Sequence, residues 1–221
     1  MAYLELKCTN NDKMDLKINK KELIFVNKSK KDNEIELLSI LSGNKISDYN
    51  KLYIDQILIN DLSKLKLNKF RKKNISTLFS SQVLADNLNV LDNIELGKLH
   101  FKDCINLDEI VKSFSLSKKI ICYPDELSKA EKTKVLLARA LIKKPKILVC
   151  DDILDDLDKK TIKKIINAFL NYIKKYNGII ILSTSNNKLC STGNKVITYK
   201  NSNIVKIKDN KKIISVGDLL C

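Results

Sequence analysis

The segment 123–158 constrains the fold of this chain more than any other part of the sequence. A helical pattern is followed there by the unbroken apolar run 147–150, which ends at two aspartates, Asp151 and Asp152. A short apolar run without alternation is typical of a strand that is buried on both faces of a parallel sheet covered by helices. The segment therefore predicts an α/β fold. Since parallel sheets bind ligands at the carboxyl ends of their strands, Asp151, Asp152 and the loop 183–187 mark the candidate site.

The remaining apolar patterns predict further strands and helices on either side of this segment. Residues 80–121 are patterned as helices and carry no strand signal, so we expect a helical insertion there. Gly43 is expected to end the first helix, because glycine is common just after a helix C-terminus. Strands are expected over 3–8, 16–27, 74–79, 147–150 and 179–183, a strand pair over 51–59, a hairpin over 195–214, and helices over 34–41, 128–143 and 159–176.

The charge and composition of the chain disfavour some classes of function. The formal net charge is +15, but Arg71 and Arg139 are the only arginines among 41 basic residues. Proteins that read phosphates or base edges use the fork of arginine, so no specific nucleic-acid partner is expected and a lysine-coated surface is favoured. The six cysteines form no CxxC pair and His100 is the single histidine, so a zinc site is not expected either.

The location of the chain is predicted from two patterns that the sequence lacks. No apolar stretch approaches the roughly 18 residues of a membrane span. The first residues do not form the basic and apolar segments of an export signal. We therefore expect a cytoplasmic protein.

The order of the motifs resembles that of the ABC transporter ATPases. Within that family the chain is most similar to the subunits that drive lipoprotein release, macrolide export and antimicrobial-peptide resistance. The resemblance covers nearly the whole chain. It rests on many separate segments that occur in the order and at the spacing of the family. These segments are Lys21-Glu22 before the first core strand, 84–96 after the Q-loop, Tyr123-Pro124 and Leu127-Ser128 at the signature, 138–141 with Pro145 and 147–151 for the signature helix and Walker B strand, and Leu157-Asp158 for the D-loop.

The resemblance implies a fold and a set of partners. The fold would be a P-loop-NTPase-like α/β core with a mixed or parallel sheet, an N-terminal antiparallel β subdomain and an inserted helical subdomain. One domain over 1–221 would consist of a core, 1–79 and 122–221, and the helical part 80–121. The partners would be a membrane permease and either a second copy or a competent ATPase subunit, which places the chain at the inner face of the cell membrane. The expected permease contacts are Gln82, Leu84, Leu88 and Val90.

The phosphate loop departs from the family pattern. A phosphate loop needs G-x-x-x-x-G-K-[ST], in which glycines expose backbone N–H groups, lysine neutralises phosphate and the hydroxyl holds Mg²⁺. Placing Leu37-Leu38 on the family's leucines puts residues 28–36 on this loop, and these residues include no glycine. Glu34 then takes the lysine position and Ile35 the hydroxyl position, and a carboxylate there would repel phosphate. Lys28, Lys30 and Lys31 remain as possible contacts for an anion.

Other nucleotide-binding motifs also lack the residues that the family uses. The Q-loop glutamine position holds Ser80, the signature glycines are Lys129 and Ala130, the general-base glutamate is Asp152, and the switch histidine is Ser185. No aromatic residue for adenine stacking occurs near residues 10–14.

Ser128 is retained at the signature, and its sequence context favours a structural role. Together with Glu131 it forms the S-x-x-E pattern of a capping box, which stabilises a helix without any nucleotide.

The resemblance assigns roles to the residues that remain. Asp151 would hold Mg²⁺ and Asp152 would be the catalytic base, although its side chain is shorter by one methylene than that of glutamate. Nucleotide contacts would come from Ser128, Asp151, Asp158, Lys28, Lys30 and Lys31.

Three hypotheses stay open at this point. The first, which we favour, is a pseudo-ATPase with weak or no hydrolysis that binds no Mg-ATP tightly and supports a permease and a second ATPase subunit. The second is an active, Mg-ATP-dependent ATPase with an atypical phosphate loop. The third is a basic scaffold that binds nucleic acid or an anionic membrane surface.

Overall fold

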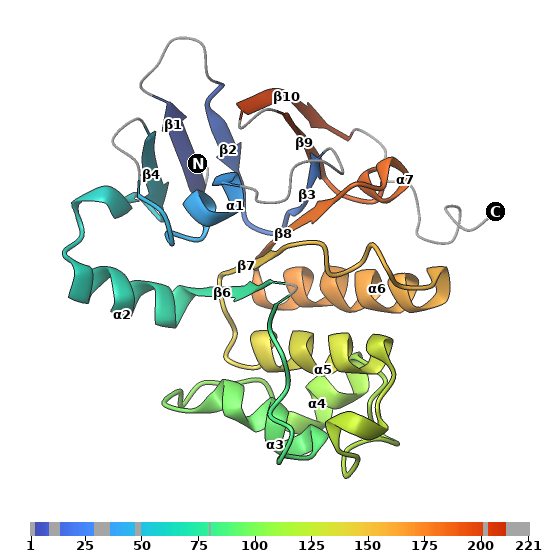
Figure 1. The fold of residues 1–221 in the computed structure, drawn as a ribbon. Helices are drawn as coiled ribbons and strands as arrows, with labels where there is room; N and C mark the ends of the chain where they lie inside the picture. Colours follow the sequence, from blue (N-terminus) through green and yellow to red (C-terminus); the bar gives the residue numbers. More distant parts are fainter. Residues whose placement is uncertain are drawn as a thin grey trace.

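The structure is a computed structural model that describes residues 3–8, 14–28, 36–46, 50–79, 81–200 and 203–210. The fold contains two sheets. Helices α5 and α6 cover the face of the larger sheet that is turned away from the smaller sheet (Figure 1). The helices are α1 (Glu36–Leu41), α2 (Lys64–Asn74), α3 (Val90–Glu95), α4 (Leu107–Ser113), α5 (Lys129–Leu141), α6 (Lys159–Tyr176) and α7 (Asn187–Cys190), with short 3₁₀ turns at Ile59–Asp61, Leu96–Lys98 and Pro124–Glu126.

The larger sheet has six strands in the order β10-β9-β3-β8-β7-β6. The five strands from β9 to β6 are parallel, and β10 pairs antiparallel with β9. The carboxyl ends of β3, β8 and β7 therefore lie side by side at one edge, where ligands bind in sheets of this kind. The strands are β3 (Leu23–Lys28), β6 (Ile75–Leu78), β7 (Ile147–Cys150), β8 (Ile179–Thr184), β9 (Lys195–Lys200) and β10 (Asn203–Asp209).

The smaller sheet is antiparallel and has the order β2-β1-β4-β5. Its strands are β1 (Leu4–Cys8), β2 (Leu16–Ile18), β4 (Asn50–Ile54) and β5 (Ile57–Leu58). The expected single strand over 16–27 is wrong, because β2 and β3 belong to different sheets. A turn separates them: Lys21 has φ of 65°, and the Glu22 carboxylate accepts hydrogen bonds from the backbone and side chain of Asn19.

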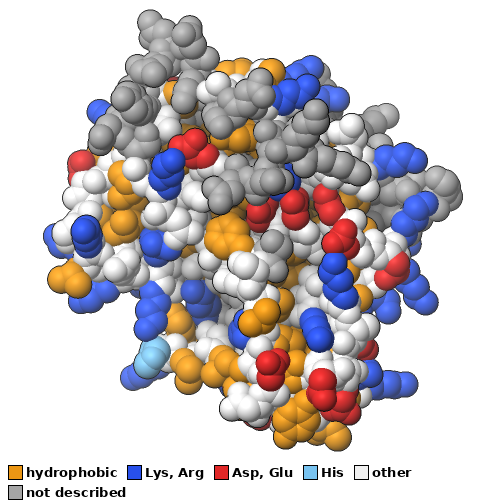
Figure 2. Space-filling model, viewed as in Figure 1, with side chains coloured by type: hydrophobic (Ala, Val, Ile, Leu, Met, Phe, Trp, Pro, Cys, Tyr) orange, Lys and Arg blue, Asp and Glu red, His pale blue; other side chains and the backbone are white. Residues whose placement is uncertain are grey.

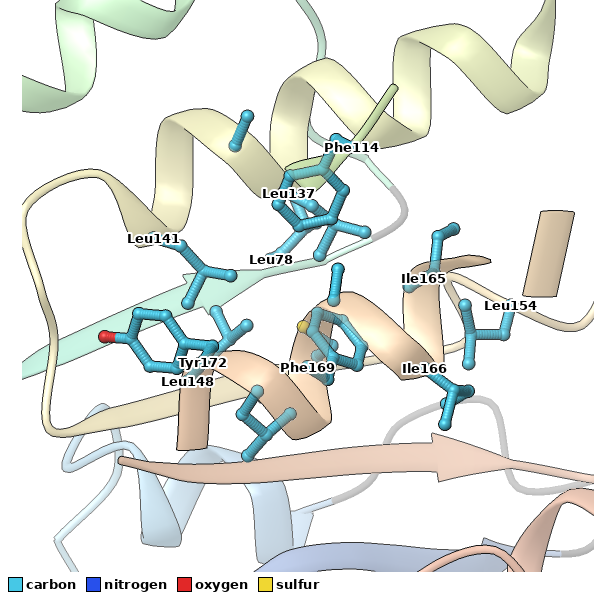
Figure 3. Close-up of a cluster of buried hydrophobic side chains, with 14 of the residues drawn as sticks. Leu78, Phe114, Leu137, Leu141, Leu148, Leu154, Ile165, Ile166, Phe169 and Tyr172 are labelled. Atoms are coloured by element: carbon cyan, nitrogen blue, oxygen red, sulfur yellow. The ribbon is translucent and has the colours of Figure 1, made fainter. Parts of the chain in front are cut away.

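Each face of the larger sheet has its own hydrophobic core. Leu148 and Ile180 face the cluster formed with α5 and α6, in which Phe169 is fully buried (Figure 3). Their neighbours Ile147 and Ile179 face the opposite cluster, which includes α1 and the smaller sheet. Alternate residues of the same strands therefore serve both cores, as expected for strands buried on both faces.

Two helices were not predicted from the sequence. Helix α2 is rich in lysine and buries only Leu67, so it lacks the apolar stripe by which an amphipathic helix is recognised. Helix α7 is only four residues long. The other predicted strands and helices are confirmed within a few residues, including the end of α1 at Gly43, whose φ is 65°.

The helical insertion packs against α5 through a close backbone contact. A Cβ atom added at Gly97 would lie 2.1 Å from the Arg139 carbonyl oxygen and 2.7 Å from Ile142 Cγ2. Arg139 also donates to the Val83 carbonyl oxygen at 2.8 Å, and buried Asn93 bonds both the N–H and the carbonyl of Ala85. No helix among the described residues is long and apolar enough to cross a membrane.

We predict that Gly97→Ala loosens the insertion. The new methyl group meets backbone that cannot move freely, so unfolding by urea should show a loss of about 1–3 kcal/mol. Leu99→Ala, at a side chain that is 56% exposed, should change the free energy of unfolding by less than about 0.5 kcal/mol. Equal stabilities of Gly97→Ala and wild type would contradict this packing.

Candidate functional site

A buried ion pair joins the carboxyl ends of β3 and β7. Lys28 is the last residue of β3, and its Nζ lies 3.3 Å from Asp151 Oδ1 and 2.5 Å from Asp152 Oδ2. Ser183 of β8 lies between the two strand ends. Its hydroxyl donates to Asp151 Oδ1 at 2.5 Å and accepts from the Asp152 backbone N–H at 2.9 Å. The sheet thus brings four residues of the predicted site into one cluster, which we call the Lys28 cluster: Lys28, Asp151, Asp152 and Ser183.

The lysine of this cluster is shielded from solvent more than its partners. The Lys28 side chain is 4% exposed, against 17% for Asp151 and 37% for Asp152. Burial acts to lower the pKa of Lys28, but the hydrogen bond to Asp152 and the charges of both aspartates outweigh it, so this pKa lies above its ordinary value. The ammonium is therefore charged, as a buried cation between two carboxylates should be.

The backbone of Asp152 is in the left-handed region. Its φ is 51°, which is uncommon for residues other than glycine but is tolerated by aspartate. The hydrogen bond from its N–H to Ser183 holds this conformation. As a result, the Asp152 carboxylate is directed at Lys28.

A second cluster fixes the loop after β8. One Asp155 carboxylate oxygen accepts from the Thr184 hydroxyl at 2.5 Å, and the other accepts from the backbone N–H and the hydroxyl of Ser185 at 3.0 and 2.8 Å. Ser185 occupies the predicted switch-histidine position, so this side chain is satisfied within the chain. The loop 183–187 was predicted from the sequence, but Asp155 was not. Asp155 lies about 30 residues before its partners in the chain, so no local pattern links them.

We tested whether the Lys28 cluster fits a divalent cation. Mg²⁺ requires a near-octahedral set of oxygens at roughly 2.0–2.1 Å. In this cluster the carboxylates converge on an ammonium, and a second cation bound to Asp151 would lie close to a like charge. The cluster as it is arranged fits the lysine and does not fit Mg²⁺.

Ser128 and Asp158 begin helices. The capping box is confirmed: the Glu131 N–H donates to Ser128 Oγ at 3.3 Å, and the Glu131 carboxylate accepts from the Ser128 N–H at 2.9 Å. Asp158 caps α6 by accepting from the Thr161 N–H at 2.9 Å. Lys129, at a signature glycine position, forms an exposed ion pair with Asp156 at 2.6 Å.

The segment expected to contact a permease is partly buried. Leu84 and Val90 are only 6% and 1% exposed and belong to the core, so they support this surface from inside. Gln82 is exposed and Leu88 is half-buried. The sequence analysis did not single out Val83, whose side chain is 76% exposed.

Several residues assigned from the sequence lie outside the described part of the chain. These are Lys30, Lys31, Glu34, Ile35, Ser80 and residues 10–13. Their assignments to the phosphate loop, the Q-loop and the adenine contact therefore stay predictions.

Comparison with known proteins places the chain in a family. Residues 36–155 match the family model described as ABC transporter. The chain belongs to the ABC transporter family. It resembles the lipoprotein-releasing system ATP-binding protein LolD of Buchnera aphidicola, with 26% identity over 90% of this chain and 89% of the relative. It also resembles the methionine import ATP-binding protein MetN 2 of Listeria monocytogenes, with 28% identity over 95% of this chain but only 60% of the relative.

The fold is that of an ABC ATP-binding cassette. The structure matches the cassette MJ0796, a dimer bound to ADP and Pi, with a TM-score of 0.80, 23% identity and coverage of 95% of this chain and 99% of that one. It also matches cbiO1 from Clostridium perfringens, with a TM-score of 0.78, 18% identity and coverage of 95% and 89%. The predicted core sheet, antiparallel β subdomain and helical subdomain are confirmed, and the family normally binds Mg-ATP.

We predict that Ser128→Ala destabilises this ABC cassette through loss of the cap. Unfolding by urea should show a loss of about 1 kcal/mol, whereas Ser128→Thr, which keeps a hydroxyl, should lose less. No change in Ser128→Ala would mean that the capping box does not stabilise α5.

Glu131 gives this box a pH dependence. Hydrogen bonds from the backbone and hydroxyl of Ser128 hold the pKa of the Glu131 carboxyl below its ordinary value of 4.5. A lowered pKa adds stability above about pH 4.5, and this stability is lost as the pH falls through the lowered value. The stability difference between wild type and Glu131→Gln should therefore shrink between pH 7 and pH values below about 4. A difference that stays constant with pH would refute this.

Proposed function

We propose that this ABC cassette is a degenerate transporter subunit that keeps the fold and partner surfaces of the family and hydrolyses ATP weakly or not at all. The observation that carries the proposal is the Lys28 cluster. Its two carboxylates correspond to the Mg²⁺ ligand and the general base, and both are engaged by an internal ammonium. A base that is paired with a buried cation is a poor acceptor for the proton of an attacking water.

The sequence departures support the same proposal. Glu34 and Ile35 replace the lysine and the hydroxyl of the phosphate loop, and Ser185 replaces the switch histidine. Ser185 bonds Asp155 within the chain, and Lys129 pairs with Asp156. Several positions that serve one ligand in the family thus have partners inside this chain.

The proposed partners are a membrane permease and a second ATPase subunit. Relatives of this chain are named for lipoprotein release and methionine import, and the similar cassette MJ0796 is a dimer. The permease would dock beside the helical insertion, where Gln82 and Val83 are exposed. Docked on the permease as a heterodimer with a competent ATPase, this chain would lie at the inner face of the cell membrane, in the cytoplasm.

An active ATPase is the second candidate, because the relatives are named as ATP-binding proteins. In that case Lys28, Lys30 or Lys31 would contact phosphate. A nucleic-acid scaffold is less well supported: on the face shown in Figure 2, Lys and Arg side chains are scattered and do not gather in one patch.

We predict that calorimetry with Mg-ATP shows weak or undetectable binding, and that the purified chain has no turnover sensitive to Asp151→Asn. A competent ABC ATPase, assayed in parallel, controls for the conditions. Mg-ATP turnover that is lost in Asp151→Asn would overturn the proposal. Tight binding that is lost in a Lys30→Ala, Lys31→Ala double variant would favour the second candidate instead.

A further inference from the structure

We propose that Lys28 takes the place of the divalent cation, so that the Walker B carboxylates of this chain carry their own built-in counter-ion. The inference concerns the regulation of the same site and rests on the proposed function. It predicts that Lys28 and a metal ion exclude each other at Asp151 and Asp152.

The geometry of the sheet makes this contact possible. Strand β8 lies between β3 and β7, so Lys28 must reach across one strand to contact Asp151. Neighbouring strands are about 4.8 Å apart, so two spacings are close to 10 Å, a gap that an extended lysine and an aspartate together can bridge. The small Ser183 at the end of β8 leaves room for this crossing and bonds the same Asp151.

The contacts and burial of Lys28 differ from those of an exposed surface ion pair. The Lys28 side chain is 4% exposed, and its Nζ contacts one oxygen from each of two aspartates. By contrast, Lys129 and Asp156 are 71% and 75% exposed, and such pairs contribute little. Two adjacent carboxylates that share one buried ammonium depend on that positive charge.

Removal of the ammonium should therefore create a cation site. In Lys28→Met the side chain keeps much of its length but loses its charge, and Asp151 and Asp152 are left close together without a counter-ion. Carboxylate oxygens of this kind are the ligands that Mg²⁺ and Mn²⁺ prefer. The variant should be less stable than wild type without metal and should regain stability when either ion binds.

The test is thermal unfolding of the whole chain without nucleotide, with and without MgCl₂ at constant ionic strength. Wild type should show no shift in Tm, and Lys28→Met should show a lowered Tm that Mg²⁺ raises by several degrees. Lys143→Met is the matched control, because Lys143 is a half-buried lysine whose Nζ donates to the Lys72 and Ile75 carbonyl oxygens at 2.9 and 3.0 Å and not to a carboxylate. Its Tm should fall without recovery in Mg²⁺.

A second measurement keeps the inference testable if Lys28→Met folds poorly. Mn²⁺ binding followed by electron paramagnetic resonance should detect no ion on wild type and one ion on Lys28→Gln, and Asp151→Asn in that background should abolish binding. A wild-type chain that binds Mn²⁺ as Lys28→Gln does, or a Lys28→Gln chain that binds none, would overturn the inference. Turnover of Mg-ATP by wild type would instead overturn the proposed function, so the two failures can be told apart.

Discussion

Parallel pairing of β3, β8 and β7 is the constraint on which the candidate site depends. It brings Lys28, Ser183 and Asp151 to one edge, although they come from three distant parts of the chain. The apolar strands are buried on both faces, so their register is fixed by two cores at once. A slip of one residue would exchange the side chains that face the two cores and would also separate the ion pair.

The Lys28 cluster is the basis of our proposal that this chain keeps the family fold while an internal side chain fills the site. A buried ion pair adds little net stability over apolar packing, but loss of one partner costs about 3–5 kcal/mol. Because Lys28 is buried, loss of Asp151, whose side chain is 17% exposed, should cost more stability than loss of Asp152, whose side chain is 37% exposed. The caps formed by Ser128 and Asp158 likewise give these motif residues a structural role.

The sequence was sufficient for most of the fold because its signals are local. The unbroken apolar run at β7, the stripe along α6 and the S-x-x-E pattern at Ser128 each depend on residues close together in the chain. Helix α2 was not predicted because its sequence is rich in lysine and Leu67 is its single buried residue, so no apolar stripe can be recognised. The resemblance assigned Lys28, Asp151 and Asp152 to one site, but the ion pair among them could not be predicted, since Lys28 and Asp151 are 123 residues apart and meet only through the strand order. The phosphate-loop role expected for Lys28 stays a prediction, and in the structure its Nζ contacts both aspartates.

We propose that an internal ammonium occupies the cation position of this ABC cassette. The most direct measurement is a crystal structure of the wild-type chain grown with Mn²⁺ and a non-hydrolysable ATP analogue, with anomalous data collected for manganese. We expect Lys28 Nζ between Asp151 and Asp152 and no anomalous peak at these carboxylates. A manganese peak bound to Asp151, with Lys28 displaced, would contradict it.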